Sequence, residues 1–215
     1  MKITILVDNP RSWFVPFAHK LQQLLASRGE AAFLSDAGEV PPGNDIAFLL
    51  SYEKIVGPEI LRRSRSNIVV HASELPKGKG MSPMTWQVLE GCNTIPLTLF
   101  EAVEALDAGP VYLRDAVNFE GNELLPEMQA LMGKKIVEMC LAFVEQWPAI
   151  LDRGVSQTGE STFYRRRSAE DSKLDPHKSI AEQFNLLRVV DNEQYPAFID
   201  WMGRRYTVRI ESAKE

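Results

Sequence analysis

One histidine stands where an apolar run gives way to a loop, a position suited to proton transfer. The stretch "NIVVHASELPKGKG" (residues 67–80) places three aliphatic residues before His71 and a segment rich in Gly and Lys after it. An imidazole titrates near neutral pH, so it can donate a proton to a substrate or accept one from it. His71 is therefore the first candidate catalytic residue; a histidine that only caps a strand end is the alternative.

A second candidate is Asp107, the first residue of the turn-forming sequence Asp-Ala-Gly-Pro. Aspartate is common in turns because its side chain bonds nearby backbone amides, so position alone indicates a turn residue. The other histidines, His19 and His177, lie in a helical pattern and in a polar stretch, which favours structural or surface roles. No His or Cys pair has the spacing of metal ligands, so we expect no metal site.

The residues before His71 predict the elements that place it. Short apolar runs typical of buried parallel strands occur at residues 3–7, 31–36, 46–52 and 67–71. Between them lie a helical pattern at residues 14–28 and a short helix opened by Pro58. This alternation predicts an α/β fold with a Rossmann-like, open, mostly parallel sheet. Ligands bind at the carboxyl ends of such strands, where His71 would lie.

The pattern changes in the second half of the chain. A short helix opened by Pro83, two strands and a long helix at residues 124–143 are expected there. The polar segment 152–162 is the most loop-like and predicts a boundary between two parts. We assign residues 1–155 to a catalytic core and residues 156–215 to a small mixed C-terminal extension, with a helix near 180–190 and a terminal strand.

Composition narrows the class of protein. The chain has 215 residues, 45% of them hydrophobic, and a formal net charge of −5. That balance disfavours nucleic acid as a partner, because binding to phosphates requires a basic face. The two cysteines, Cys92 and Cys140, are expected to be buried in a reducing compartment. Neither a signal peptide nor a membrane span is indicated, so a cytoplasmic protein without membrane contact is expected.

Three blocks of the sequence resemble the formyltransferase family that uses N10-formyltetrahydrofolate. That family includes glycinamide ribonucleotide, methionyl-tRNA and sugar N-formyltransferases. The first block matches a His…Ser-x-Leu-Pro…Gly loop, the second an Asp-x-Gly turn, and the third an Asn-x-x-Arg…Pro…Ala-Phe tail. The matching residues are His71, Ser73, Leu75, Pro76, Gly80, Pro83, Asp107, Gly109, Pro110, Asn185, Arg188, Pro196, Ala197 and Phe198.

The resemblance implies a site and a donor. His71 and Asp107 would be catalytic, with Asp107 orienting the histidine. N10-formyltetrahydrofolate would be the co-substrate and would contact Leu50, Tyr52, Leu106 and Asp107. The sequence looks most like sugar N-formyltransferases of pseudaminic-acid-type pathways. The expected acceptor is therefore a nucleotide-linked sugar such as a UDP-4-amino-4,6-dideoxy sugar. The resemblance assigns its binding to Ser73, Lys77, Lys79, Ser82 and Arg188, and it suggests a homodimer.

One position departs from the family pattern. An asparagine is expected two residues before the histidine, where its amide would hold the developing oxyanion, but this chain has Val69. Valine cannot donate a hydrogen bond. Ser73, Ser82, Thr85 and the backbone amides of residues 76–80 are alternative donors. Two other functions therefore stay open: a folate or nucleotide-sugar binding module without catalysis, and a hydrolase of formyl-folate.

Overall fold

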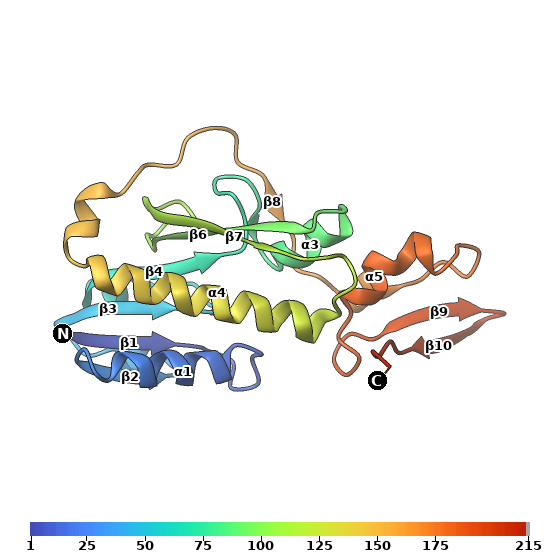
Figure 1. Cartoon of the computed structure of the whole chain (residues 1–215), viewed down its shortest axis with the longest axis horizontal. Helices are drawn as coiled ribbons and strands as arrows, with labels where there is room; N and C mark the ends of the chain where they lie inside the picture. The colour runs from blue at the N-terminus through green and yellow to red at the C-terminus, as the bar shows by residue number, and fades with distance from the viewer. Residues whose placement is uncertain (214–215) are drawn as a thin grey trace.

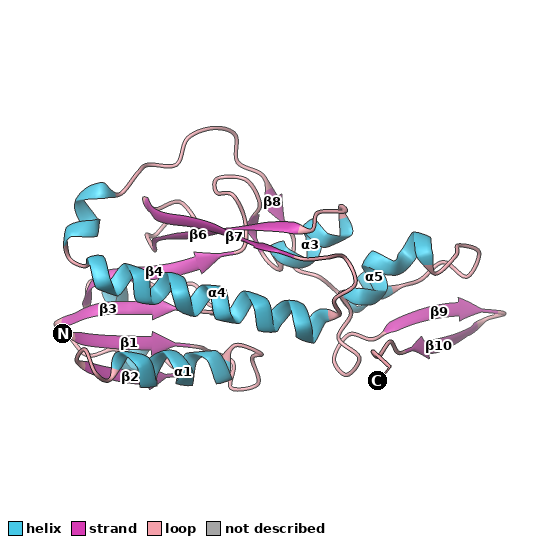
Figure 2. Ribbon diagram, in the orientation of Figure 1, coloured by secondary structure: helices cyan, strands magenta, loops and turns pink. Residues whose placement is uncertain are grey.

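Six strands form one central sheet in the order β2-β1-β3-β4-β6-β7 in the computed structural model, which describes residues 1–213 (Figure 1; Figure 2). The strands are β1 (Lys2–Leu6), β2 (Glu30–Leu34), β3 (Asn44–Leu49), β4 (Ser64–His71), β6 (Thr94–Glu101) and β7 (Val111–Asn118). β1 to β4 are parallel, whereas β6 pairs antiparallel with β4 and β7 antiparallel with β6. The predicted mostly parallel α/β sheet is confirmed.

The described residues form five α-helices, the two longest of which pack on one face of this sheet. The five helices are α1 (Val15–Leu25), α2 (Pro58–Leu61), α3 (Pro83–Leu89), α4 (Leu125–Gln146) and α5 (Phe184–Arg188). α1 and α4 lie side by side in front of the strands in Figure 1. A Cβ at Gly133 of α4 would lie 2.6 Å from the Phe17 ring, so a glycine at this position lets the two helices approach. Apolar side chains of both helices and of the strands form the main core.

The C-terminal part differs from the expectation in detail. The helix predicted near residues 180–190 is split into a 3₁₀ turn (Ala181–Gln183) and α5. The predicted terminal strand is β10 (Arg204–Val208), one arm of a hairpin whose other arm, β9 (Ala197–Trp201), was not predicted. Further 3₁₀ turns span Ala37–Glu39, Ala149–Arg153 and Ala169–Ser172. Leu174, Leu187, Val190 and Ala197 give this part its own apolar cluster.

A second small sheet joins the two parts of the chain. β5 (Lys79–Gly80) pairs in parallel with β8 (Phe163–Tyr164), so the loop after His71 is paired with the extension. The boundary between residues 155 and 156 stays a prediction. Cys140 is buried as expected, but Cys92 is exposed, because it follows the end of α3 on the surface. Among residues 1–213, no helix has the length and apolarity needed to cross a membrane.

Candidate active site

His71 ends β4 at the carboxyl edge of the parallel strands, where the sequence places it. Leu49 of β3 lies opposite Val69, and Thr98 of β6 lies opposite His71, so the strand is held on both sides. The imidazole is buried, and its Nε2 lies 2.8 Å from the carbonyl oxygen of Gly78. A carbonyl only accepts hydrogen bonds, so Nε2 carries the proton, which leaves Nδ1 as the basic nitrogen of the neutral ring.

Two glycines give the loop after His71 its shape. Gly78 and Gly80 have φ angles of 68° and 95°, in the left-handed region. A Cβ at Gly78 would lie 2.9 Å from the Cβ of Ser73, and one at Gly80 would lie 2.4 Å from the carbonyl oxygen of Tyr164. Both positions therefore lack room for a side chain. The loop folds back over His71 and presents the Gly78 carbonyl to the ring.

Asp107 contacts the same loop through its side chain. Its carboxylate Oδ2 accepts a hydrogen bond of 3.0 Å from the backbone amide of Gly80. Asp107 itself has a φ of 48°, which is uncommon for a residue with a side chain. The structure thus brings both residues to one loop, where His71 contacts Gly78 and Asp107 contacts Gly80. In the described part of the chain the carboxylate bonds Gly80 rather than the imidazole ring.

Residues 157–164, which we call the bracing segment, hold this arrangement from outside. The Oγ1 of Thr162 accepts from the Gly78 amide at 2.8 Å, and its carbonyl accepts from Lys79. Gln157 donates from Nε2 to the carbonyl oxygens of Asp107 and Gly109, at 3.0 and 2.9 Å. The bracing segment therefore contacts both the His71 loop and the Asp107 turn.

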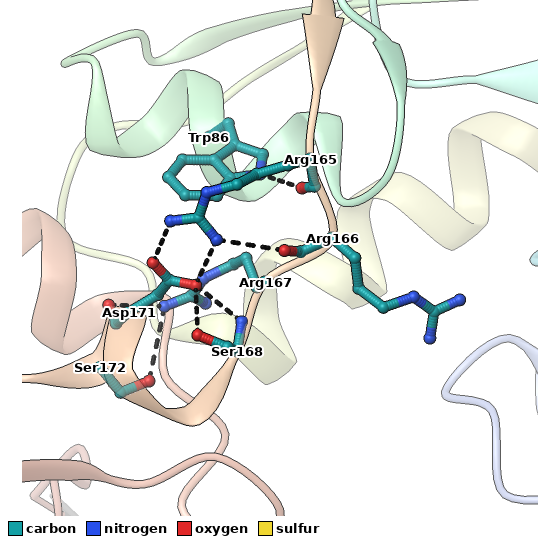
Figure 3. Close-up of polar contacts among 7 residues, drawn as sticks. All are labelled: Trp86, Arg165, Arg166, Arg167, Ser168, Asp171 and Ser172. Carbon is teal, nitrogen blue, oxygen red and sulfur yellow. Dashed lines mark hydrogen bonds and ion pairs between the residues drawn. The ribbon is translucent and has the colours of Figure 1, made fainter.

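The end of the bracing segment is anchored by a cluster around Trp86 (Figure 3). The Arg165 guanidinium lies 4.7 Å from the centre of the Trp86 ring and forms two hydrogen bonds with the Asp171 carboxylate. Trp86 in turn donates from its indole nitrogen to the Arg165 carbonyl, and its ring stacks on Tyr164. This cluster ties β8 to α3. Asp171 neutralises the charge of Arg165, and Glu53 pairs with Arg166 at 2.9 Å.

The residues expected to bind the acceptor have different environments. Lys77 is exposed on the loop, and Ser82 is exposed just before α3. Lys79 is buried, with its ammonium group 5.9 Å from the centre of the Phe163 ring. Ser73 is buried, and its hydroxyl has no partner among the described residues. Of these four, Lys77 and Ser82 present side chains to solvent.

A cleft of about 230 Å³ opens beside the loop that follows His71. It is lined by residues 74–77, Arg114 and residues 158–160. Arg114 of β7 donates to the Leu75 carbonyl at 2.9 Å, which fixes the loop at this wall. A larger cavity of about 410 Å³ lies between the start of α4 and residues 190–193 and 210–212. None of the residues that line it belongs to the His71 loop or the Asp107 turn, so of these two cavities only the smaller one adjoins the His71 loop.

Arg188 has a structural environment. Its side chain is only 1% exposed and bonds Asn185 and Asn93, with Glu123 at 3.6 Å. Backbone amides and the Arg188 charge hold the pKa of Glu123 below its ordinary value despite partial burial, which alone would raise it. Arg188 joins α5 to the residues before α4. These contacts give no support to the prediction that it binds the acceptor.

The residues expected to contact the donor surround an apolar edge of the sheet. Leu50 is buried and its amide donates to Leu6, whereas Tyr52 is half-buried, which raises the pKa of its phenol. Leu6, Leu49, Tyr52, Val56, Val69 and Ala102 belong to one apolar cluster. Leu106, just before Asp107, is 55% exposed. The Leu50 side chain is thus buried and its amide engaged, whereas Tyr52 and Leu106 offer apolar surface.

A carboxyl group that sequence reasoning missed lies just before the Asp107 turn. Glu101, the last residue of β6, accepts hydrogen bonds from the Asn67 amide at 2.5 Å and the Tyr112 hydroxyl at 3.2 Å. Burial raises the pKa of Glu101 to about 7, and these hydrogen bonds offset only part of the effect. Tyr112 has a raised pKa as well, because it is partly buried beside this carboxyl.

Other contributing residues also carried no signal in the sequence. Gln157 and Thr162 fall in a polar segment without periodicity, and Arg114 looks like an exposed strand residue. All three act through hydrogen bonds to the backbone of distant segments. No motif marks such contacts. Among the described residues, no group of three or more His, Cys, Asp or Glu side chains is arranged to hold a metal ion.

Known proteins resemble this chain in sequence. The model of the formyl transferase family matches residues 27–135, just over half of the chain. The methionyl-tRNA formyltransferase of Thermodesulfovibrio yellowstonii is 30% identical over 148 residues, which are 67% of this chain and 47% of that protein. The chain therefore spans about half the length of this curated relative.

Solved structures share the fold over nearly the whole chain. A methionyl-tRNA formyltransferase from Clostridium thermocellum has a TM-score of 0.80 and 20% identity, covering 100% of this chain and 94% of that one. HypX from Aquifex aeolicus in complex with tetrahydrofolic acid has a TM-score of 0.76 and 16% identity, covering 98% and 37%. A sugar N-formyltransferase from Shewanella has a TM-score of 0.71 and 12% identity, covering 100% and 99%. With the family match, these findings confirm the resemblance: the chain belongs to the formyl transferase family.

Proposed function

We propose that this protein transfers a formyl group from N10-formyltetrahydrofolate to the amine of a nucleotide-linked amino sugar. The observation that carries the proposal is the convergence of His71 and Asp107 on the loop at residues 78–80, at the carboxyl edge of the sheet. A buried imidazole and a nearby carboxylate are the groups that acyl transfer to an amine requires. Membership of the formyl transferase family supports the choice of donor.

The apolar edge near Asp107 fits a folate. Ile55 and Leu106 expose 85% and 55% of their surface, one after the end of β3 and one just before Asp107. Flat heterocyclic ligands are held in sites lined by apolar side chains with a few polar groups. When bound, the donor supplies the formyl carbon: the amine nitrogen bonds to it, its bond to N10 breaks, and the proton lost by the amine passes to N10.

The chain supplies a base, a hydrogen-bond donor and charge to this reaction. Because the Nε2–H group of His71 is bonded to the Gly78 carbonyl, the free Nδ1 is the base that relays the proton lost by the attacking amine. Asp107 brings negative charge to the same loop, which compensates the positive charge on the attacking nitrogen. Val69 lies two residues before His71 and contributes no donor. Among the hydroxyl alternatives, the buried, unpartnered hydroxyl of Ser73 is the best supported donor to the developing oxyanion.

Size and charge support a small acceptor. The likeness to the Shewanella sugar N-formyltransferase extends over 99% of that chain, and the net charge of −5 opposes the binding of a tRNA backbone. Lys77 stands exposed on the wall of the 230 Å³ cleft, which suits one phosphate of a nucleotide. The methionyl-tRNA formyltransferase from Clostridium thermocellum has a similar length, so methionyl-tRNA belongs in the test as the competing acceptor.

The test is an acceptor screen with purified protein and N10-formyltetrahydrofolate. UDP-linked 4-amino sugars and methionyl-tRNA are offered in parallel, and mass spectrometry follows a gain of about 28 Da, the exchange of one hydrogen for one formyl group. We expect the gain on an amino sugar. His71→Asn and Asp107→Ala should abolish it without unfolding the protein, and Ser73→Ala should lower kcat about 100-fold, the usual cost of one oxyanion donor. Full activity in the first two variants would refute the roles proposed for them.

A binding module is the second candidate, and Val69 favours it, because the chain lacks the amide donor that the resemblance leads one to expect. Such a module would bind tetrahydrofolate in a calorimetric titration and give no formylated product with any acceptor. Release of formate without an acceptor would indicate hydrolysis instead. The same protein sample therefore separates the three functions.

A further inference from the structure

We propose that Gln157 is a positioning residue that holds the Asp107 turn in its working shape, an inference that rests on the proposed formyl transfer. The side-chain amide donates to two carbonyl oxygens of the turn, Asp107 at 3.0 Å and Gly109 at 2.9 Å. Gln157 is partly buried and lies beyond the residues that the family model matches, which end at 135. One side chain from the bracing segment thus bridges both ends of the turn.

The turn needs such support because its backbone is strained. Asp107 adopts a φ of 48°, a left-handed conformation that is unfavourable for a residue with a side chain. Gly109 cannot be exchanged, since a Cβ there would lie 1.8 Å from the carbonyl oxygen of Glu101. Strained conformations persist only when surrounding groups fix them. Gln157 supplies two of the hydrogen bonds that fix this one.

The orientation of the Gln157 amide follows from its partners. Both partners are carbonyl oxygens, which only accept, so the NH₂ end must face the turn. The other end, Oε1, is buried and has no partner among the described residues. Burying an unpaired acceptor is costly, so the two bonds from Nε2 are what keep the side chain in this position. Both of these bonds go to the Asp107 turn and neither goes to the bracing segment.

These bonds form a continuous connection to the catalytic loop. Gln157 donates to the backbone carbonyl of Asp107, the Asp107 carboxylate accepts from the Gly80 amide, and the Gly78 carbonyl accepts a hydrogen bond from His71 Nε2. Losing the Gln157 bonds would release the Asp107 carboxylate from Gly80 while His71 remains on β4. The expected defect is therefore in the chemical step, and acceptor binding should be preserved.

The kinetic test replaces Gln157 by methionine, which keeps the volume and removes the hydrogen bonds. Gln157→Met is expected to lower kcat about 10- to 100-fold, as misplaced catalytic groups do, with KM for the amino sugar changed less than about threefold. Gln183 is a matched control, because its amide also donates to backbone carbonyls, those of Asp175, Lys178 and Ser179 in the extension. Gln183→Met should leave kcat unchanged. An unchanged kcat in Gln157→Met would overturn the proposal.

A double-mutant cycle separates positioning from a general structural role. If Gln157 acts through Asp107, then Gln157→Met should lower kcat less than about twofold in an Asp107→Asn background, because the group it positions is already impaired. A purely structural role predicts the same fold-loss in both backgrounds. Equal losses would therefore overturn the proposal.

A third readout does not depend on catalysis. The Gly80 amide donates to Asp107, so its hydrogen exchange, followed by NMR, should become at least about tenfold faster in Gln157→Met and stay unchanged in Gln183→Met. An unaltered Gly80 exchange rate would overturn the proposal. If the wild-type protein formylates no acceptor but Gly80 exchange responds as expected, the proposed function fails while the role of Gln157 in holding Asp107 stands.

Discussion

The raised pKa of Glu101 predicts that the protein loses stability as the pH rises from acid to neutral. The group titrates near 4.5 in the unfolded chain and near 7 in the folded protein, because burial disfavours its charge. The folded state therefore binds the proton more tightly. The stabilising contribution is complete below pH 4.5 and is lost as the pH rises through 7, and its full size is about 3 kcal/mol.

Replacing Glu101 by glutamine isolates this contribution. Glutamine keeps the shape and an acceptor for the Asn67 amide, and it carries no charge at any pH. The difference in unfolding free energy between Glu101→Gln and the wild type should be constant below pH 4.5. It should grow in favour of the variant between pH 4.5 and 7 and level off at about 3 kcal/mol. The measurement is urea denaturation between about pH 4 and pH 8.5, followed by tryptophan fluorescence.

Tyr112→Phe tests the cause of the shift. The Tyr112 hydroxyl bonds the Glu101 carboxylate and lowers its pKa, so its removal should move the transition to higher pH. Other carboxyl groups do not interfere in this window. Glu123 and Asp200, for example, have lowered pKa values, so their contributions are lost only in more acidic solution. A Glu101→Gln difference that does not change between pH 5 and 8.5 would refute the assignment.

Two further variants, each with a control variant, test packing near the site and away from it. Gly80→Ala should destabilise the protein more than Gly91→Ala, since both glycines have φ angles near 95° but only the Cβ at residue 80 would meet a backbone oxygen, 2.4 Å away. Thermal melting measures both, and equal losses would contradict the close approach of β8. Arg188→Met should cost about 3–5 kcal/mol of unfolding free energy, because it leaves Glu123 beside a buried, uncharged neighbour. The exposed Arg205→Met should cost far less, and a small loss for Arg188→Met would show that its burial contributes little.

The sequence predicted the parts of the molecule that follow periodic or motif-like rules. The parallel strands, the long helix and the placing of His71 at a strand end came from apolar patterning, and Asp107 gained its role from the resemblance. The predictions were weaker where polar side chains bond distant backbone. The contacts of Gln157 and Thr162 depend on where a non-periodic segment lies in three dimensions, and no spacing in the sequence indicates this.

Arg188 shows a related limit. The resemblance in the tail led to the expectation that Arg188 contacts the acceptor. In the structure the guanidinium is enclosed by Asn93, Asn185 and Glu123, which come from three separate stretches of the chain. A sequence motif can single out a residue such as Arg188, but it does not show whether that residue binds a ligand or stabilises the fold.

The pairing of β5 with β8 is expected to form late in folding, after the central sheet. Residues 79–80 meet residues 163–164, so this contact closes a far longer loop than the pairing of β4 with β6. Contacts between residues that are distant in the sequence form late, because closing the loop costs entropy before the new contacts can stabilise the structure. During synthesis the sheet can therefore be complete while the loop beside His71 still awaits the strand that braces it. A chain ended at residue 155 would keep the sheet and lose the support of its catalytic loop.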